Sequence, residues 1–98
     1  MKMKFNKWSQ SRILAGKKTL TSRTKKHEND PDVLHIFGPL PLWFIKTYLY
    51  RDEGAESPEE LQRVINQIFR RVVKDDRLFY VHVIDTYSLI GKWALGEG

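Results

Sequence analysis

One amphipathic helix constrains the fold of this chain more than any other segment. Ser57-Pro58-Glu59-Glu60 combines a hydroxyl at the N-cap, a proline at the first helical position and a glutamate at the third, which makes a complete capping box. Apolar side chains then recur at helical spacing, at Leu61, Val64, Ile65, Ile68, Phe69 and Val72. One face of the helix is therefore apolar, so the chain must provide a core on which that face can lie.

Four other segments are predicted to be strands, because each is rich in β-branched and aromatic residues. They are Thr19–Arg23, Val33–Phe37, Trp43–Tyr50 and Leu78–Ile84. Two prolines, Pro39 and Pro41, precede the third of these segments. Each proline removes a backbone donor, so we expect strand pairing to stop there.

A short helix of one or two turns is predicted at Ser11–Ala15, with Gly16 ending it. The chain of 98 residues is too short for two independent cores, so we expect one domain over residues 1–87. Residues 88–98 form a C-terminal tail that either closes the core or frays. Several short strands with an inserted helix predict an α+β fold, built as a small mixed sheet or barrel.

Positive charge is concentrated at the start of the chain. Residues 1–30 carry nine Lys and Arg against Glu28 and Asp30, a net charge of +7, whereas the remaining 68 residues carry a net charge of −2. A field this uneven favours a polyanionic partner such as nucleic acid. Alternatively, these charges only keep the protein soluble and bind no polyanion.

Several functional classes can be set aside. The chain has no cysteine, which excludes disulfides and thiolate chemistry, and it has no apolar run as long as a membrane span of roughly 18 residues. The N-terminus lacks the apolar segment of a signal peptide, so we expect a cytoplasmic protein. Gly16-Lys17-Lys18-Thr19 is no P-loop, because Ser11 stands where the motif needs a glycine. The three histidines are far apart in sequence, so we expect no metal and no cofactor.

Four segments in order resemble the ASCH domain family. Ile13–Arg23 (ILAGKKTLTSR) resembles its signature, in which a short helix ends at glycine and a Lys-x-x-(Thr or Glu)-x-Arg strand follows. Asp30–Gly38, Glu53–Leu61 and Leu78–Ile84 resemble its next strand, its acidic lead into a capped helix and its closing strand. The resemblance implies a small PUA-like mixed β-barrel of about five strands, with one long and one short flanking helix. Proteins use this fold to bind RNA and modified nucleosides.

The resemblance also implies roles for particular residues. The acetylcytidine amidohydrolases of this family use a lysine as base, a threonine as nucleophile and a glutamate as proton donor. By position these residues are Lys18, Thr21 and Glu53, with Arg23 nearby and Glu56 as a second candidate for the acidic position.

The residues themselves allow two interpretations. A threonine hydroxyl needs a base, and lysine can serve only if desolvation or a cationic neighbour such as Lys17 or Arg23 lowers its pKa. Alternatively, the threonines only favour a strand and the cations only bind phosphate. Alternation along the strand directs Thr21 and Arg23 to one face and Ser22 to the other, so Lys18 must lie at the strand's entry to reach Thr21.

Four functional hypotheses follow. The first is an RNA- or nucleoside-binding domain, in which Lys17, Lys18, Arg23, Lys25 and Lys26 hold phosphate. An aromatic residue, Trp8, Trp43 or Tyr50, would stack on a base in such a domain. The second hypothesis is an amidohydrolase acting on an acylated nucleoside, the third a small ribonuclease, and the fourth an adaptor with no chemistry of its own.

Overall fold

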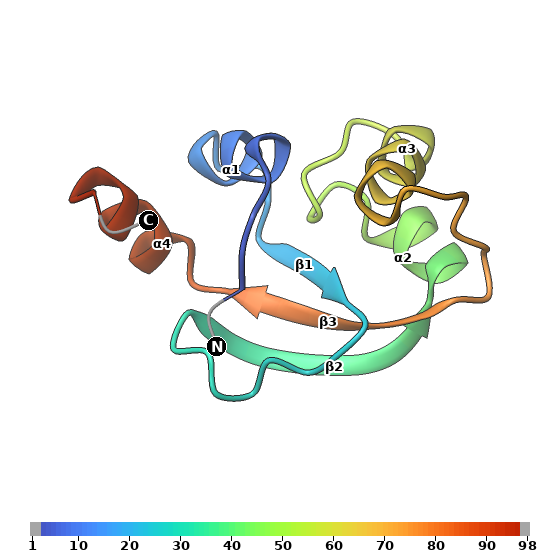
Figure 1. Cartoon of the computed structure of the whole chain (residues 1–98), viewed down its shortest axis with the longest axis horizontal. Coiled ribbons are helices and arrows are strands. Elements are labelled where there is room, and N and C mark those ends of the chain that lie inside the picture. Colours follow the sequence, from blue (N-terminus) through green and yellow to red (C-terminus); the bar gives the residue numbers. More distant parts are fainter. Residues whose placement is uncertain (1–2, 97–98) are drawn as a thin grey trace.

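The computed structural model describes residues 3–96 and contains three strands and four helices within them (Figure 1). In chain order the elements are α1 (Lys7–Leu14), β1 (Leu20–Arg23), β2 (Val33–Pro41), α2 (Leu42–Tyr48), α3 (Pro58–Phe69), β3 (Leu78–Ile84) and α4 (Thr86–Ala94). The predicted α+β class is confirmed. Within residues 3–96 the sheet is open and three-stranded, where about five strands were expected.

The last strand of the chain lies in the middle of the sheet. The strand order is β1-β3-β2, and both pairings are antiparallel, with Thr21 opposite His82 and Phe37 opposite Val81. β3 covers the predicted range Leu78–Ile84. β1 is an edge strand that begins one residue after the predicted Thr19 and ends, as predicted, at Arg23.

The main core lies between the sheet and the helices α2 and α3. Its buried members come from β1, α2, α3, β3 and the loops beside them: Leu20, Leu42, Ile45, Ala55, Leu61, Ile65, Val73, Phe79 and Val81. A second cluster joins α1 to α4 through Met3, Ile13, Ile84 and Leu89. In Figure 1, α1, α2 and α3 lie on the same side of the sheet, and a gap between α1 and α3 lies above β1.

The capped helix forms where the sequence predicts it. The Ser57 hydroxyl accepts a hydrogen bond from the backbone N–H of Glu60, and the Glu60 carboxylate accepts one from the backbone N–H of Glu56. The helix ends at Phe69 because Arg70 adopts a left-handed conformation with φ of 56°. Val72 was therefore wrongly assigned to the apolar face, and its side chain is 78% exposed.

Trp43–Tyr50, predicted to be a strand, forms helix α2 instead. Leu42 and Ile45 lie one helical turn apart and are both fully buried in the core, and Leu49 packs against the same cluster. This helical spacing of core contacts outweighs the strand preference of the aromatic residues. Trp43, between the two core positions, is 48% exposed.

The prediction that pairing stops at the prolines is also wrong. β2 continues to Pro41, which lies opposite Leu78 after an irregularity between Phe37 and Leu40. β2 is an edge strand, so a proline there need not remove a ladder bond, because its nitrogen can face away from β3.

A helix lies close to each end of the described chain. α1 begins at Lys7, earlier than predicted, because the Asn6 side chain caps it by accepting from the N–H of Ser9. Gly16, with φ of +75°, follows its end as predicted. α4 occupies much of the C-terminal tail, is capped by Asp85 and buries Leu89. No helix within residues 3–96 is long and apolar enough to cross a membrane.

Candidate functional site

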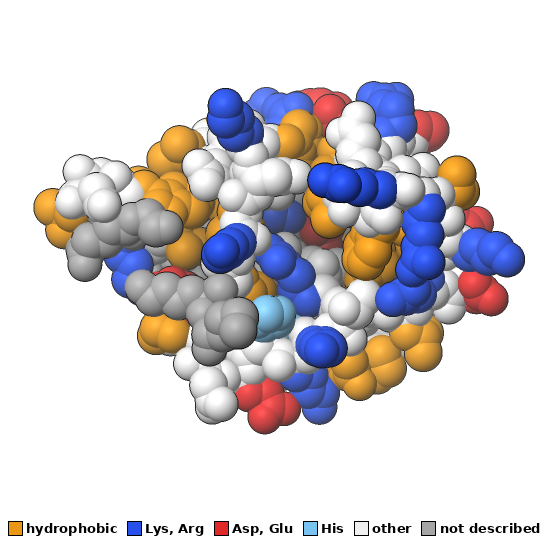
Figure 2. All heavy atoms as spheres, in the orientation of Figure 1, with side chains coloured by type: hydrophobic (Ala, Val, Ile, Leu, Met, Phe, Trp, Pro, Cys, Tyr) orange, Lys and Arg blue, Asp and Glu red, His pale blue; other side chains and the backbone are white. Residues whose placement is uncertain are grey.

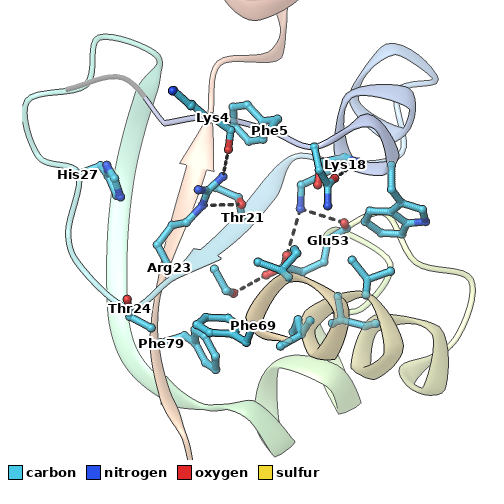
Figure 3. A pocket seen from close by; sticks show the side chains of 18 of the residues that line it. Lys4, Phe5, Lys18, Thr21, Arg23, Thr24, His27, Glu53, Phe69 and Phe79 are labelled. Carbon is cyan, nitrogen blue, oxygen red and sulfur yellow. Dashed lines mark hydrogen bonds and ion pairs between the residues drawn. The ribbon is translucent and has the colours of Figure 1, made fainter. Parts of the chain in front are cut away.

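A pocket of about 570 Å³ lies beside β1, an edge strand of the sheet. Its wall comes from the N-terminal segment, α1, β1, the loop after β1, the Glu53 turn, α3 and β3 (Figure 3). The lining divides into two chemical groups. The polar group includes Lys4, Lys18, Thr21, Ser22, Arg23, Lys25, His27 and Glu53. The apolar group consists of Phe5, Trp8, Leu61, Val64, Ile65, Ile68, Phe69 and Phe79.

Lys18 and Glu53 form a buried ion pair in the wall of this pocket. The Lys18 ammonium donates to Glu53 Oε1 and to the Glu53 backbone carbonyl, each at 3.1 Å, and both residues are 3% exposed. A backbone bridge also joins the two residues. Gly54 permits this approach: it has φ of +96°, and a Cβ there would lie 2.8 Å from Arg12 Cβ and 3.0 Å from Lys18 Cβ.

Burial lowers the pKa of Lys18, because the ammonium has lost most of its contact with water. Glu53 opposes this change through its charge and its hydrogen bond, and Arg23 adds a smaller effect that lowers the pKa. A lysine in this environment releases its proton more readily than a lysine at the surface.

Ser22 also binds the Glu53 carboxylate, and it was not predicted as a site residue. Its hydroxyl donates to Glu53 Oε2, so both carboxylate oxygens have a donor. The alternation expected for β1 holds, since Thr21 and Arg23 meet each other and Ser22 meets Glu53. Both faces of the strand nevertheless line one pocket, because β1 is an edge strand and the pocket lies beside it. Sequence alternation alone placed Ser22 away from Thr21 and gave no reason to include it.

Thr21 and Arg23 form the opposite part of the polar wall. Thr21 is 4% exposed, and its hydroxyl oxygen accepts a hydrogen bond of 3.3 Å from Arg23 Nε. Arg23 Nη2 donates to the Lys4 backbone carbonyl at 2.8 Å, and its guanidinium lies over the Phe5 ring, 5.2 Å from the centroid. Burial also lowers the pKa of Arg23, opposed by Glu53 and Asp30. Among residues 3–96, no hydrogen bond joins Lys18 directly to Thr21.

A histidine pair supports the loop that follows β1. His82 is fully buried, and its Nε2 accepts a hydrogen bond of 3.0 Å from the backbone N–H of His27, which lines the pocket. His82 Nδ1 lies 3.0 Å from the Tyr80 carbonyl, which can only accept, so the proton is on Nδ1 and the ring is neutral. Burial lowers the pKa of His82, and the neighbouring His27 adds to this effect.

The structure thus brings Lys18, Thr21, Arg23, Lys25 and Glu53 to one pocket, and it separates other predicted residues from it. Lys17 pairs with Glu56 at 3.1 Å outside the pocket, which removes Glu56 as the acidic candidate there. Lys26 lies 4.0 Å from Glu28 and over the Tyr80 ring. Figure 2 shows Lys and Arg side chains around a hollow between α1 and α3.

The three aromatic candidates for base stacking are also separated. Trp8 lines the pocket, and the Arg12 guanidinium lies over its ring, 5.2 Å from the centroid. Trp43 and Tyr50 lie outside the pocket lining, and Tyr50 packs against the main core. Phe5 lines the pocket as well, although the sequence did not single it out.

No group of three His, Cys, Asp or Glu side chains within residues 3–96 is placed to hold a metal ion. No family model matches this chain, and no match was found among curated proteins or among solved structures.

Proposed function

We propose that the pocket binds a single acylated nucleoside and hydrolyses its amide bond. The observation that carries this proposal is the buried Lys18–Glu53 pair, which shares a pocket with the buried hydroxyl of Thr21. A buried pair of ionised side chains is expensive to maintain, and perturbed pairs of this kind occur preferentially at functional sites. The resemblance to the ASCH amidohydrolases, a proposal in itself, assigns the base, the nucleophile and the proton donor to these three positions.

The first half of the reaction forms an acyl-threonine. When the substrate excludes water, a proton moves from the Lys18 ammonium to the Glu53 carboxylate along their hydrogen bond, leaving a neutral amine. The amine takes the Thr21 proton as the hydroxyl oxygen attacks the acyl carbonyl. As the carbon–nitrogen bond breaks, Glu53 gives its proton to the leaving nitrogen, and the ion pair is restored.

The second half repeats these steps with water. Lys18 transfers its proton to Glu53 again, the neutral amine takes a proton from water, and the resulting hydroxide attacks the acyl-threonine ester. Glu53 then protonates the departing Thr21 oxygen, so amide and water become amine and carboxylic acid. The missing contact between Lys18 and Thr21 is compatible with this sequence, because catalytic hydrogen bonds often tighten only in the substrate complex.

The remaining wall suits one nucleoside. A volume of about 570 Å³ lies within the usual range for small-molecule sites, roughly 300–1,000 Å³. The apolar side chains of α3, with Phe5 and Trp8, offer packing for a base and a sugar. We further propose that the open sheet, extended at its edge by the Lys18–Glu53 bridge, corresponds to part of the PUA-like barrel that the resemblance implies.

The decisive experiment compares two threonines of the same segment. Thr21→Ala should lower the turnover of acetylcytidine by about 10³-fold or more, as loss of a nucleophile does. Thr19→Ala, at an exposed position two residues earlier, should leave turnover unchanged. Release of cytidine can be followed by chromatography, with circular dichroism as a check on folding. Absence of turnover by the wild-type protein, or full turnover by Thr21→Ala, would overturn the proposal.

A second candidate function is RNA binding without chemistry, favoured by the positive charge around the hollow in Figure 2. In this case Arg23 and Lys25 would hold the backbone, and Lys17 and Lys26 would extend the basic surface beyond the pocket. Affinity for single-stranded RNA should then fall steeply as salt rises from about 50 to 200 mM. A flat salt response would exclude this function. Cleavage of the RNA in the same assay would point to the ribonuclease hypothesis.

A further inference from the structure

We infer that the natural substrate carries a phosphate monoester, which Lys4, Arg23 and Lys25 bind. This inference rests on the proposed function and names a chemical group that the proposed reaction does not itself require. A neutral acylated nucleoside would satisfy the hydrolysis described above. The charges of the pocket favour a nucleotide.

The pocket is lined by more positively charged side chains than the proposed hydrolysis requires. Among residues 3–96, four cations line it, Lys4, Lys18, Arg23 and Lys25, and Glu53 is the one carboxylate. Glu53 is committed to Lys18 and Ser22. None of the other three cations makes an ion pair within residues 3–96. A phosphate monoester carries a charge of about −1.5 to −2 at neutral pH and would offset most of this excess.

Arg23 is already held in place for such a ligand. Its Nε and Nη2 are engaged by Thr21 and by the Lys4 carbonyl, and the Phe5 ring lies against its guanidinium. Two of its five N–H groups are used in these contacts, which leaves donors for an anion in a fixed, planar arrangement. An anchored guanidinium loses little further freedom on binding, which favours affinity.

The two lysines line the pocket from different segments of the chain. Lys4 belongs to the N-terminal segment and is tied to Arg23 through its carbonyl, and Lys25 follows β1 by two residues. Both side chains are exposed, so each can move to meet a ligand. In Figure 3, Lys4, Arg23 and Thr21 lie toward one end of the pocket, and Phe69 and Phe79 lie toward the other. Phosphate binding near Lys4 would leave Thr21 for the acyl group and the apolar end for the base.

The test compares cytidine with cytidine monophosphate, first as ligands and then as their acetylated substrates. Calorimetry should give at least about tenfold tighter binding of the monophosphate, and kcat/KM for the acetylated pair should differ by a similar factor. Lys25→Met should bring both ratios toward one. Lys74→Met removes the same charge at an exposed position outside the pocket and should leave both ratios unchanged.

The outcomes separate this inference from the proposed function. Hydrolysis of both acetylated substrates with equal kcat/KM, or equal binding of the two ligands, would overturn the phosphate site and leave the amidohydrolase intact. Preferred binding of the monophosphate without any hydrolysis would support the phosphate site and overturn the amidohydrolase. A third ligand, a short cytidine-containing RNA with only phosphodiesters, should bind more weakly than the monophosphate at equal salt. Tighter binding of that RNA would overturn the inference in favour of strand binding.

Discussion

Lys17 and Lys18 are neighbours in the chain, and each pairs with a glutamate from the same short turn, Lys17 with Glu56 and Lys18 with Glu53. The nitrogen–oxygen distance is 3.1 Å in both pairs. The side chains of the outer pair are 52% and 67% exposed, and those of the inner pair are 3% and 4% exposed. The two pairs therefore share their chemistry and differ in their contact with water.

This difference determines what each pair can do. In water the outer charges are screened, and pairs of that kind contribute little to stability or chemistry. The inner charges have lost their hydration, so each depends on the other and on Ser22. Moving a proton from Lys18 to Glu53 removes two buried charges at once. Burial therefore favours release of the Lys18 proton, an effect that the exposed outer pair lacks.

The largest expected effect comes from removing one member of each pair. Glu53→Gln leaves the Lys18 ammonium buried without a counter-charge and should lower the free energy of unfolding by about 3–5 kcal/mol. Glu56→Gln should give no measurable change, because water takes over the role of that carboxylate. Urea denaturation of both variants would measure the contrast. Equal, small effects would show that the inner pair is not isolated from water.

A double variant separates stability from chemistry in the same pair. Lys18→Met with Glu53→Leu replaces two charges by apolar side chains of similar size and should recover most of the stability lost in Glu53→Gln. It should stay inactive on acetylcytidine, because both proton-transfer groups are gone. A double variant that is as unstable as the single one would contradict this account of the pair.

Ser22 allows a smaller change to the inner pair. Ser22→Ala leaves Glu53 Oε2 buried without its donor and should lower the free energy of unfolding by about 1–3 kcal/mol. Activity should fall by about tenfold as the carboxylate loses its orientation, with the loss in kcat rather than in KM. Ser22→Thr keeps the hydroxyl on a residue that strands accept well, and it should retain most of the activity. Equal activity of the two variants would show that the Ser22 hydroxyl does not contribute to activity.

The sequence predicted those elements whose local signals and tertiary contacts agree. The capping box and apolar spacing of α3 and the β-branched run of β3 survive in the fold. α2 was mistaken for a strand, because its aromatic residues favour strands while its two fully buried positions, Leu42 and Ile45, are one helical turn apart. Whether the strand preference or the helical spacing decides the structure depends on the core that the rest of the chain provides. The sequence of this segment alone does not contain that information.

The candidate site was predictable only in part for the same reason. Lys18, Thr21 and Glu53 were named through a resemblance between segments, and the structure gathers all three at one pocket. Apart from that resemblance, charge and spacing did not separate Lys17 from Lys18, because their difference arises from the Gly54 turn that brings Glu53 against only one of them. Lys4, Phe5 and His27 were missed because no sequence motif singles them out and only the fold brings them to the pocket. A charge count could only mark the region as basic.

The comparison of buried and exposed groups extends to the histidines, where the smallest effect is expected. Protonating buried His82 would break the bond from the His27 N–H and place a charge near Arg23, whereas His35 is exposed. The folded protein lowers the pKa of His82, so the unfolded chain binds its proton more readily. The stability due to neutral His82 is complete above the ordinary histidine pKa of about 6.5 and is lost as pH falls below it. His82→Gln should flatten the fall in melting temperature between about pH 7 and pH 5, and His35→Gln should not. An unchanged slope in His82→Gln would assign the fall to other groups.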